Sequence, residues 1–116
     1  MAEDLSPDAC RARYAQRLTD ELEALLQAGN DTKDDRKPVE LDQQSVGRLS
    51  RMDALQGQAM AQALEGRRQG RGRAIVAALE RLQGDDFGWC DDCGEFIGAR
   101  RLDLDPTVQK CVHCAR

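Results

Sequence analysis

Two pairs of cysteines near the C-terminal end constrain this chain more than any other feature. Each pair has two residues between its members, and seventeen residues separate the pairs. The four cysteines are Cys90, Cys93, Cys111 and Cys114. This spacing is typical of four-cysteine zinc sites, because two intervening residues let both thiolates of a pair reach one ion. We therefore predict one Zn²⁺ ion in a small finger over residues 85–116.

The predicted zinc site is structural, because four cysteines leave no ligand position for water. Two disulfides or free thiols are the alternative. The acidic start of the chain, residues 1–5, lacks a hydrophobic signal core, so we expect a cytoplasmic protein, where paired cysteines favour metal. Gly94 suits a turn with positive φ. We expect His113 to be an exposed knuckle residue, with metal ligation as the alternative, and Cys10 to be a packing residue, with a redox role as the alternative.

The composition indicates long solvated helices around a small core. Of the 116 residues, 41% are hydrophobic, 33% are charged and only 3% are aromatic. The net charge of −4 argues against non-specific binding to nucleic acid, which needs a basic excess. No stretch approaches the roughly 20 apolar residues that span a bilayer, so we expect no membrane association.

Capping signals and apolar spacing predict the first helix over residues 7–28. Ser6 is suited to the N-cap and Pro7 to the first helical position, whereas Gly29 and Asn30 would end the helix. Its apolar side chains recur at intervals of three and four residues. They are Tyr14, Leu18, Leu22, Leu25 and Leu26.

A second, longer helix is predicted to follow a loop at about residues 29–42, which contains Pro38. It begins near Asp42 or Ser45 and runs to about Gln83, with glycines between residues 66 and 72 that should weaken or bend it. Its expected apolar stripe includes Met52, Leu55 or Gln56, Met60, Leu64, Ile75, Ala78 and Leu82. The predicted fold is mainly α: a long antiparallel, coiled-coil-like hairpin over residues 1–84, followed by the zinc finger. About 25 Å of the second helix would lack a helical partner.

The segment from Asp85 to Leu102, DDFGWCDDCGEFIGARRL, resembles the DksA/TraR family of C4 zinc-finger proteins. The later segment from Asp105 to Cys114 fits the same family pattern. The resemblance implies a bacterial transcription regulator that binds RNA polymerase rather than DNA. In that family the finger docks at the rim of the secondary channel, and the hairpin inserts toward the active centre. We expect a monomer that is not an enzyme.

The resemblance also implies an acidic hairpin tip, with the family pattern D-x-x-D-x-A. Counted back from the first cysteine without gaps, this pattern falls on Gly47, Ser50 and Met52, which do not match it. The nearest equivalents are Asp53 with Ala54, and Asp42. They are the candidate polymerase contacts at the tip.

A basic position of the family's hairpin coincides with Arg67, which is a fourth contact candidate; a solvated helix arginine is the alternative. Some family members bind guanosine tetraphosphate through basic residues. At those positions this chain has Ala74, Asp105 and Ala115, which lack positive charge. We therefore expect weak or absent dependence on this alarmone.

Two other classes of function compete with the polymerase-binding hypothesis. A zinc ribbon that binds nucleic acid or another protein directly could use a basic stripe, with Trp89 or Phe87 stacking on bases. The stripe would consist of Arg67, Arg68, Arg71, Arg73, Arg100 and Arg101. An enzyme is the third class, but the metal site is closed and the chain has one histidine and no visible general base.

Overall fold

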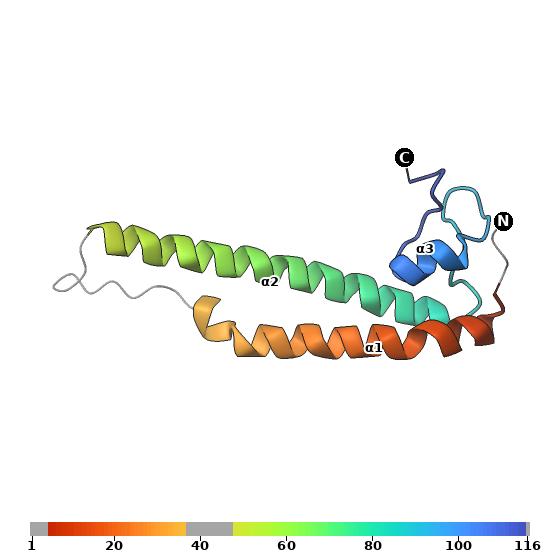
Figure 1. Ribbon diagram of the computed structural model, residues 1–116, viewed down its shortest axis with the longest axis horizontal. Coiled ribbons are helices and arrows are strands. Elements are labelled where there is room, and N and C mark those ends of the chain that lie inside the picture. The colour runs from red at the N-terminus through yellow and green to blue at the C-terminus, as the bar shows by residue number, and fades with distance from the viewer. Residues whose placement is uncertain (1–4, 37–47, 116) are drawn as a thin grey trace. The chain divides into compact units, whose positions relative to one another are not determined.

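The structure is a computed structural model that describes residues 5–36 and 48–115 (Figure 1). It is mainly α: an antiparallel helical hairpin precedes the four-cysteine finger. The helices are α1 (Pro7–Asp31), the short 3₁₀ helix η1 (Lys33–Arg36), α2 (Arg48–Gln83) and α3 (Ala99–Leu104).

The chain forms two compact units. The first unit is Met1–Glu23 with Gly72–Arg116, and the second is Ala24–Arg71. Within each unit a segment of α1 lies beside a segment of α2 that runs in the opposite direction (Figure 1). Among the described residues, no helix combines the length and the apolar character that crossing a membrane requires.

The start of α1 confirms the predicted cap. The Ser6 side chain accepts a hydrogen bond from the Ala9 N–H at 3.1 Å, and its carbonyl accepts one from Cys10 at 2.9 Å. The helix begins at Pro7, where proline's missing N–H costs no hydrogen bond.

The end of α1 differs from the prediction, because the helix continues beyond Ala28 to Asp31. Its terminal carbonyls have side-chain partners: Thr32 Oγ1 donates to Ala28 at 2.9 Å, and Arg36 donates to Gly29 at 3.0 Å. Gly29 also has a packing role inside the helix, since a Cβ there would lie 3.0 Å from Glu65 Oε1. The glycine therefore allows close approach rather than ending the helix.

The apolar core lies in the first unit. The N-terminal half of α1 packs against the C-terminal half of α2, and the finger covers their ends. The Tyr14 and Phe87 rings are 5.4 Å apart. Core residues from these elements include Cys10, Tyr14, Leu18, Ile75, Ala78, Leu82, Phe87, Phe96, Ile97 and Leu102. The stripe predicted for the second helix is therefore correct in its C-terminal part.

The second unit is held by polar contacts instead. Glu65 accepts hydrogen bonds from Arg36 at 3.3 Å and Arg68 at 3.5 Å, and only 13% of its side chain is exposed. Of the described residues of this unit, only Gly29 is buried. The prediction that the N-terminal part of the α2 stripe packs is wrong here: Met52, Leu55, Met60 and Leu64 are exposed. The half-buried side of this segment is polar, and it carries the arginine and glutamate contacts.

A cluster of hydrogen bonds fastens α3 to α1 in the first unit. Both Asp103 carboxylate oxygens accept from the Arg13 guanidinium, at 2.8 and 2.6 Å, and Oδ1 also accepts from the Tyr14 hydroxyl at 2.9 Å. Arg17 donates to the carbonyls of Asp103 and Leu104 at the C-terminus of α3. These contacts orient the finger on the helices of its own unit. The residues lie far apart in the sequence, so no spacing pattern predicted them.

Candidate metal centre

Two knuckle turns of the same kind bring the cysteines together. The Gly94 N–H donates to the Cys90 carbonyl at 3.0 Å, and the Ala115 N–H donates to the Cys111 carbonyl at 3.0 Å. Gly94 has φ +74°, which confirms the positive φ expected of it. A hydrogen bond of 2.8 Å from the Asp91 N–H to the Gln109 carbonyl ties the two turns together.

The four predicted cysteines form one cluster. Their sulfur atoms all lie within 4.8 Å of one another, and the Cys93 and Cys111 sulfurs are 3.8 Å apart. A tetrahedral ion with Zn–S bonds near 2.3 Å needs sulfurs about 3.8 Å apart, whereas a disulfide needs about 2 Å. The cluster therefore fits one structural zinc ion, and none of its four cysteines forms a disulfide in the structure.

The protonation of the cluster also suits a cation. Backbone N–H groups of Cys111 and Cys93 lower the pKa of the Cys90 thiol to about 6. By contrast, the sulfurs of Cys111, Cys90 and Cys93 raise the pKa of Cys114 to about 12. One thiolate forms readily here, but four together repel one another. A bound dication removes that conflict, because metal coordination deprotonates thiols.

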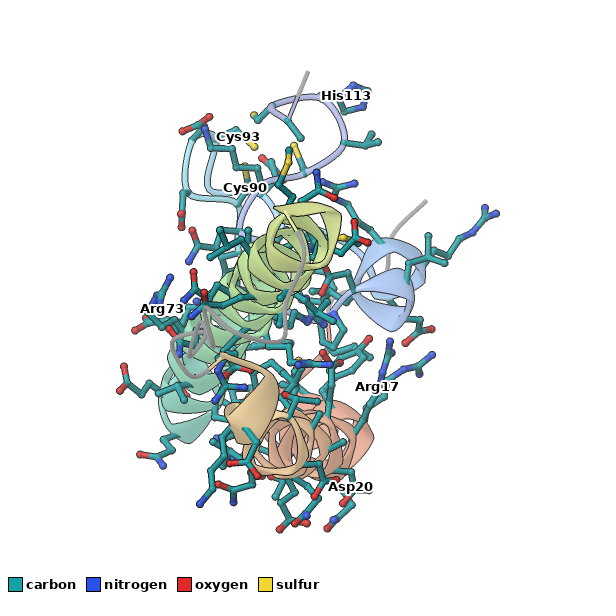
Figure 2. The ribbon with its side chains drawn as sticks, turned by 90° about the vertical axis from the view of Figure 1, so that its left-hand side faces the viewer. Arg17, Asp20, Arg73, Cys90, Cys93 and His113 are labelled. Atoms are coloured by element: carbon teal, nitrogen blue, oxygen red, sulfur yellow. The ribbon has the colours of Figure 1, made fainter. Side chains whose placement is uncertain are left out.

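The two other residues considered for metal or redox chemistry lie apart from the cluster. His113 is exposed and points away from the cysteine sulfurs (Figure 2). Cys10 is buried in the α1 core, where burial raises the pKa of its thiol. A thiol with a raised pKa holds less reactive thiolate, so the packing interpretation of Cys10 is the better one.

A glycine lies close to an aromatic ring where the two sides of the finger's first knuckle form a β-bridge. Trp89 and Phe96 form an antiparallel bridge, and their rings meet edge to face with centroids 5.4 Å apart. Gly88 has φ +91°, and a Cβ there would lie 2.7 Å from Phe96. Only glycine fits this position without displacing the ring.

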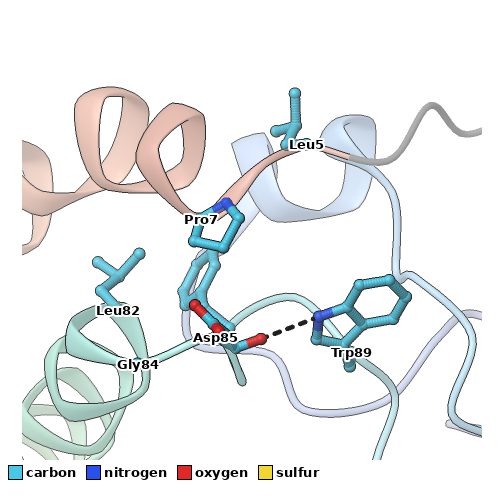
Figure 3. A pocket seen from close by; sticks show the side chains of 7 residues that line it. Leu5, Pro7, Leu82, Gly84, Asp85 and Trp89 are labelled. Atoms are coloured by element: carbon cyan, nitrogen blue, oxygen red, sulfur yellow. Dashed lines mark hydrogen bonds between the residues drawn. The ribbon is translucent and has the colours of Figure 1, made fainter.

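A small pocket lies where the finger meets the helix ends of its unit (Figure 3). Leu5 lines it from the segment before α1, Pro7 from the start of α1, Leu82 from the end of α2, and Phe87 and Trp89 from the finger. The Trp89 indole N–H donates to the Asp85 carbonyl at 3.2 Å. Since Trp89 is the one tryptophan of the chain, its fluorescence reports on the folding of the finger.

The candidate polymerase contacts belong to the second unit, whereas the metal centre belongs to the first. Asp53, Ala54 and Arg67 are exposed on the part of α2 that belongs to the second unit. Asp42 lies outside the described residues. The structure thus brings together the predicted metal ligands, whereas Asp53, Ala54 and Arg67 are surface positions of a helix.

Fold and site define the class of protein: a helical hairpin that carries a C-terminal C4 zinc finger. Residues 85–116 match the family described as the prokaryotic dksA/traR C4-type zinc finger. The finger, which is less than a third of the chain, is therefore similar to the DksA/TraR family, as its motifs indicated.

Named relatives share the finger region. Over 42 residues, which are 36% of this chain, it is 52% identical to the RNA polymerase-binding transcription factor DksA of Haemophilus influenzae and 40% identical to that of Escherichia coli. These matches cover 29% and 28% of the relatives, so the curated proteins are matched over less than a third of their length.

A solved structure extends the similarity to the helices. The chain is similar to transcription factor DksA2 from Pseudomonas aeruginosa, with a TM-score of 0.70 and 25% sequence identity. This match covers 94% of the chain and 79% of the DksA2 chain. The likeness therefore includes the hairpin as well as the finger.

Proposed function

We propose that this protein binds RNA polymerase and regulates transcription through the enzyme's secondary channel, without catalysing a reaction. The observation that carries the proposal is the combination of a DksA-type finger with a DksA2-like arrangement over 94% of the chain. Relatives that share the finger are named RNA polymerase-binding transcription factors. Such a partner would place the protein in the cytoplasm.

Each part of the fold has a separate task in this proposal. The zinc ion holds the two knuckles together, and the Asp103 cluster fixes α3 against α1. The finger thereby forms a stable docking module. The exposed residues Asp53, Ala54 and Arg67 of α2 are free to meet the polymerase, and we propose Asp42 as an additional contact.

The charge distribution favours a protein partner over direct binding of nucleic acid. Arginines of the basic stripe bond within the chain, among them Arg68 with Glu65 and Arg101 with the Lys110 carbonyl at 2.9 Å. The stripe therefore offers fewer uncommitted guanidinium groups to phosphates than its six arginines would suggest, and the net charge of the chain is negative.

We also propose weak or absent regulation by guanosine tetraphosphate at the family's basic positions. The Asp105 carboxylate accepts hydrogen bonds from the Thr107 N–H at 3.0 Å and from its hydroxyl at 2.7 Å. Asp105 therefore shapes the turn before Pro106, and it places negative rather than positive charge where phosphates would bind.

Binding to purified bacterial core RNA polymerase tests the proposed function. The zinc-loaded chain should co-purify with the polymerase, and a protein known to occupy the secondary channel should displace it. A fluorescent DNA-binding titration serves as the control and should show no specific affinity. Failure to bind polymerase, or tight salt-dependent binding to DNA alone, would reject the proposal.

A further inference from the structure

One face of α2 in the second unit is mostly apolar, and it stays exposed in the part of the chain that the structure describes. It covers an arc of about 140° on the helix, given 3.6 residues per turn. The exposed fractions of its three large side chains are 52% for Met52, 73% for Met60 and 41% for Leu64. We call this surface the Met60 face. It consists of Met52, Asp53, Gln56, Ala59, Met60, Ala63, Leu64 and Arg67, all of which are exposed.

The contacts with α1 and η1 leave the Met60 face uncovered. Glu65 and Arg68 form the polar cluster with Arg36 on a different side of α2. Gly57 and Gly66 lie beside the face, and a Cβ at either position would meet nothing within 4 Å. Packing among the described residues thus requires neither glycine, although each costs about 1 kcal/mol in a helix relative to alanine.

The charges of the Met60 face are complementary to those of a second copy. Asp53 and Arg67 lie seven residues before and after Met60, so all three occupy equivalent positions along the helix. Two copies that meet in antiparallel orientation at Met60 place each Asp53 opposite the partner's Arg67. A parallel pair would instead oppose like charges at both positions.

We propose that the Met60 face is a self-association surface, on which α2 pairs with α2 of a second copy about a twofold axis at Met60. The small side chains of Ala59 and Ala63 let the helices approach closely, and methionine adapts to an imperfect fit. The pair buries Asp53 and Arg67, the residues proposed above as polymerase contacts. Self-association is therefore incompatible with polymerase binding through these residues, although it does not depend on that function.

The association is weak and reversible. The segment from Met52 to Arg67 is about 23 Å long, and it presents less than the roughly 800 Å² per partner of a stable interface. We expect a dissociation constant on the order of 0.1 mM. The monomer expected from the sequence is then the dilute form, and the dimer is the concentrated form.

Sedimentation of the full-length, zinc-loaded and reduced chain from micromolar to millimolar concentration tests this pairing. The wild type should dimerise, whereas Asp53→Arg and Arg67→Asp should each weaken the dimer about tenfold, because both cross-pairs become repulsive. An equimolar mixture of these two variants should recover wild-type affinity, since every Arg then faces an Asp. The double variant Asp53→Arg/Arg67→Asp should recover it as well.

Matched variants separate the face from general effects on the helix. Met60→Glu should weaken the dimer at least tenfold, while Met60→Leu should preserve it. Gln62→Glu adds the same charge on the other side of α2 and should leave the dimer unchanged; circular dichroism confirms that each variant is folded. A wild type that stays monomeric at millimolar concentration would overturn the proposal. So would a dimer that is indifferent to both charge reversals.

Discussion

At the level of single residues, the Asp103 carboxylate accepts the side-chain hydrogen bonds from Arg13 and Tyr14 that join the finger to α1. The hydrogen bonds from Arg13 and then from Tyr14 hold the pKa of Asp103 at about 2. Burial, followed by the hydrogen bond to Asp103, raises the pKa of Tyr14 to about 12 from its ordinary value of 10. The two shifts have opposite directions because the hydrogen bond favours the ionised carboxylate and the neutral phenol.

The raised pKa of Tyr14 predicts how the stability of the fold changes at alkaline pH. Folding raises the pKa of Tyr14. The stability that the neutral Tyr14 hydroxyl contributes is therefore fully present below pH 10, and it is lost as the pH rises through about 12. Because Tyr14 is the only tyrosine, ultraviolet absorbance follows its ionisation directly. Asp103→Asn should move the midpoint part of the way back toward 10, since burial remains the larger cause. An unchanged midpoint in this variant would show that the hydrogen bond does not form in solution.

Some residues of the site were predictable because their signals are local. Ser6 and Pro7 define a helix start within four residues, and Gly94 follows its knuckle directly. The contact between Tyr14 and Asp103 joins positions 89 residues apart, and no periodicity in the sequence encodes it. Gly29 was misinterpreted as a helix end because its partner, Glu65, also lies far from it in the sequence, beyond any local pattern.

At the level of elements, the finger depends on its metal more than on its core. Cys93→Ser removes one of four ligands, so zinc should leave and the finger should unfold, as metal binding and folding are coupled. Metal analysis should show less than one zinc per chain, and Trp89 fluorescence should shift toward that of an exposed indole. Far-ultraviolet circular dichroism should change little, because α3 contributes only six helical residues.

The fifth cysteine provides the control for this experiment. Cys10→Ala also removes a thiol, but Cys10 lies in the α1 core and outside the sulfur cluster. This variant should retain one zinc per chain despite some loss of stability from the packing defect. Zinc loss in Cys10→Ala, or a native Trp89 spectrum in metal-free Cys93→Ser, would contradict the assignment.

Replacing two glycines in different environments compares the role of glycine in α2 with its role in the finger. Gly57 lies inside α2 with open space around its Cβ position, so Gly57→Ala should raise the free energy of unfolding by about 1 kcal/mol. Gly88 has φ +91° and touches Phe96, so Gly88→Ala should lower it by about 2 kcal/mol. Chemical denaturation of both variants measures the difference. Equal effects would mean that neither environment persists in solution.

For the whole molecule, the division into two units separates the residues that stabilise the fold from the exposed residues that are available to partners. The apolar core, the zinc cluster and the Asp103 cluster all belong to the first unit. The second unit exposes its apolar residues and relies on Glu65 with its arginines. Changes to the surface of the second unit should therefore alter interactions with partners more than they alter folding.

Asp53 allows this separation to be tested on the proposed polymerase function. Asp53→Ala should weaken the effect on transcription several-fold more than it weakens binding to polymerase, because the docking finger is untouched. Transcription from a sensitive promoter and a direct binding assay should be measured with the same preparations. Gln62→Ala, an exposed change on the same helix, is the matched control and should affect neither. At low micromolar concentration a dimer with a dissociation constant on the order of 0.1 mM is hardly populated, so self-association does not confuse the comparison. Equal loss of binding and regulation would place Asp53 in docking, and no loss of either would remove it from the contact surface.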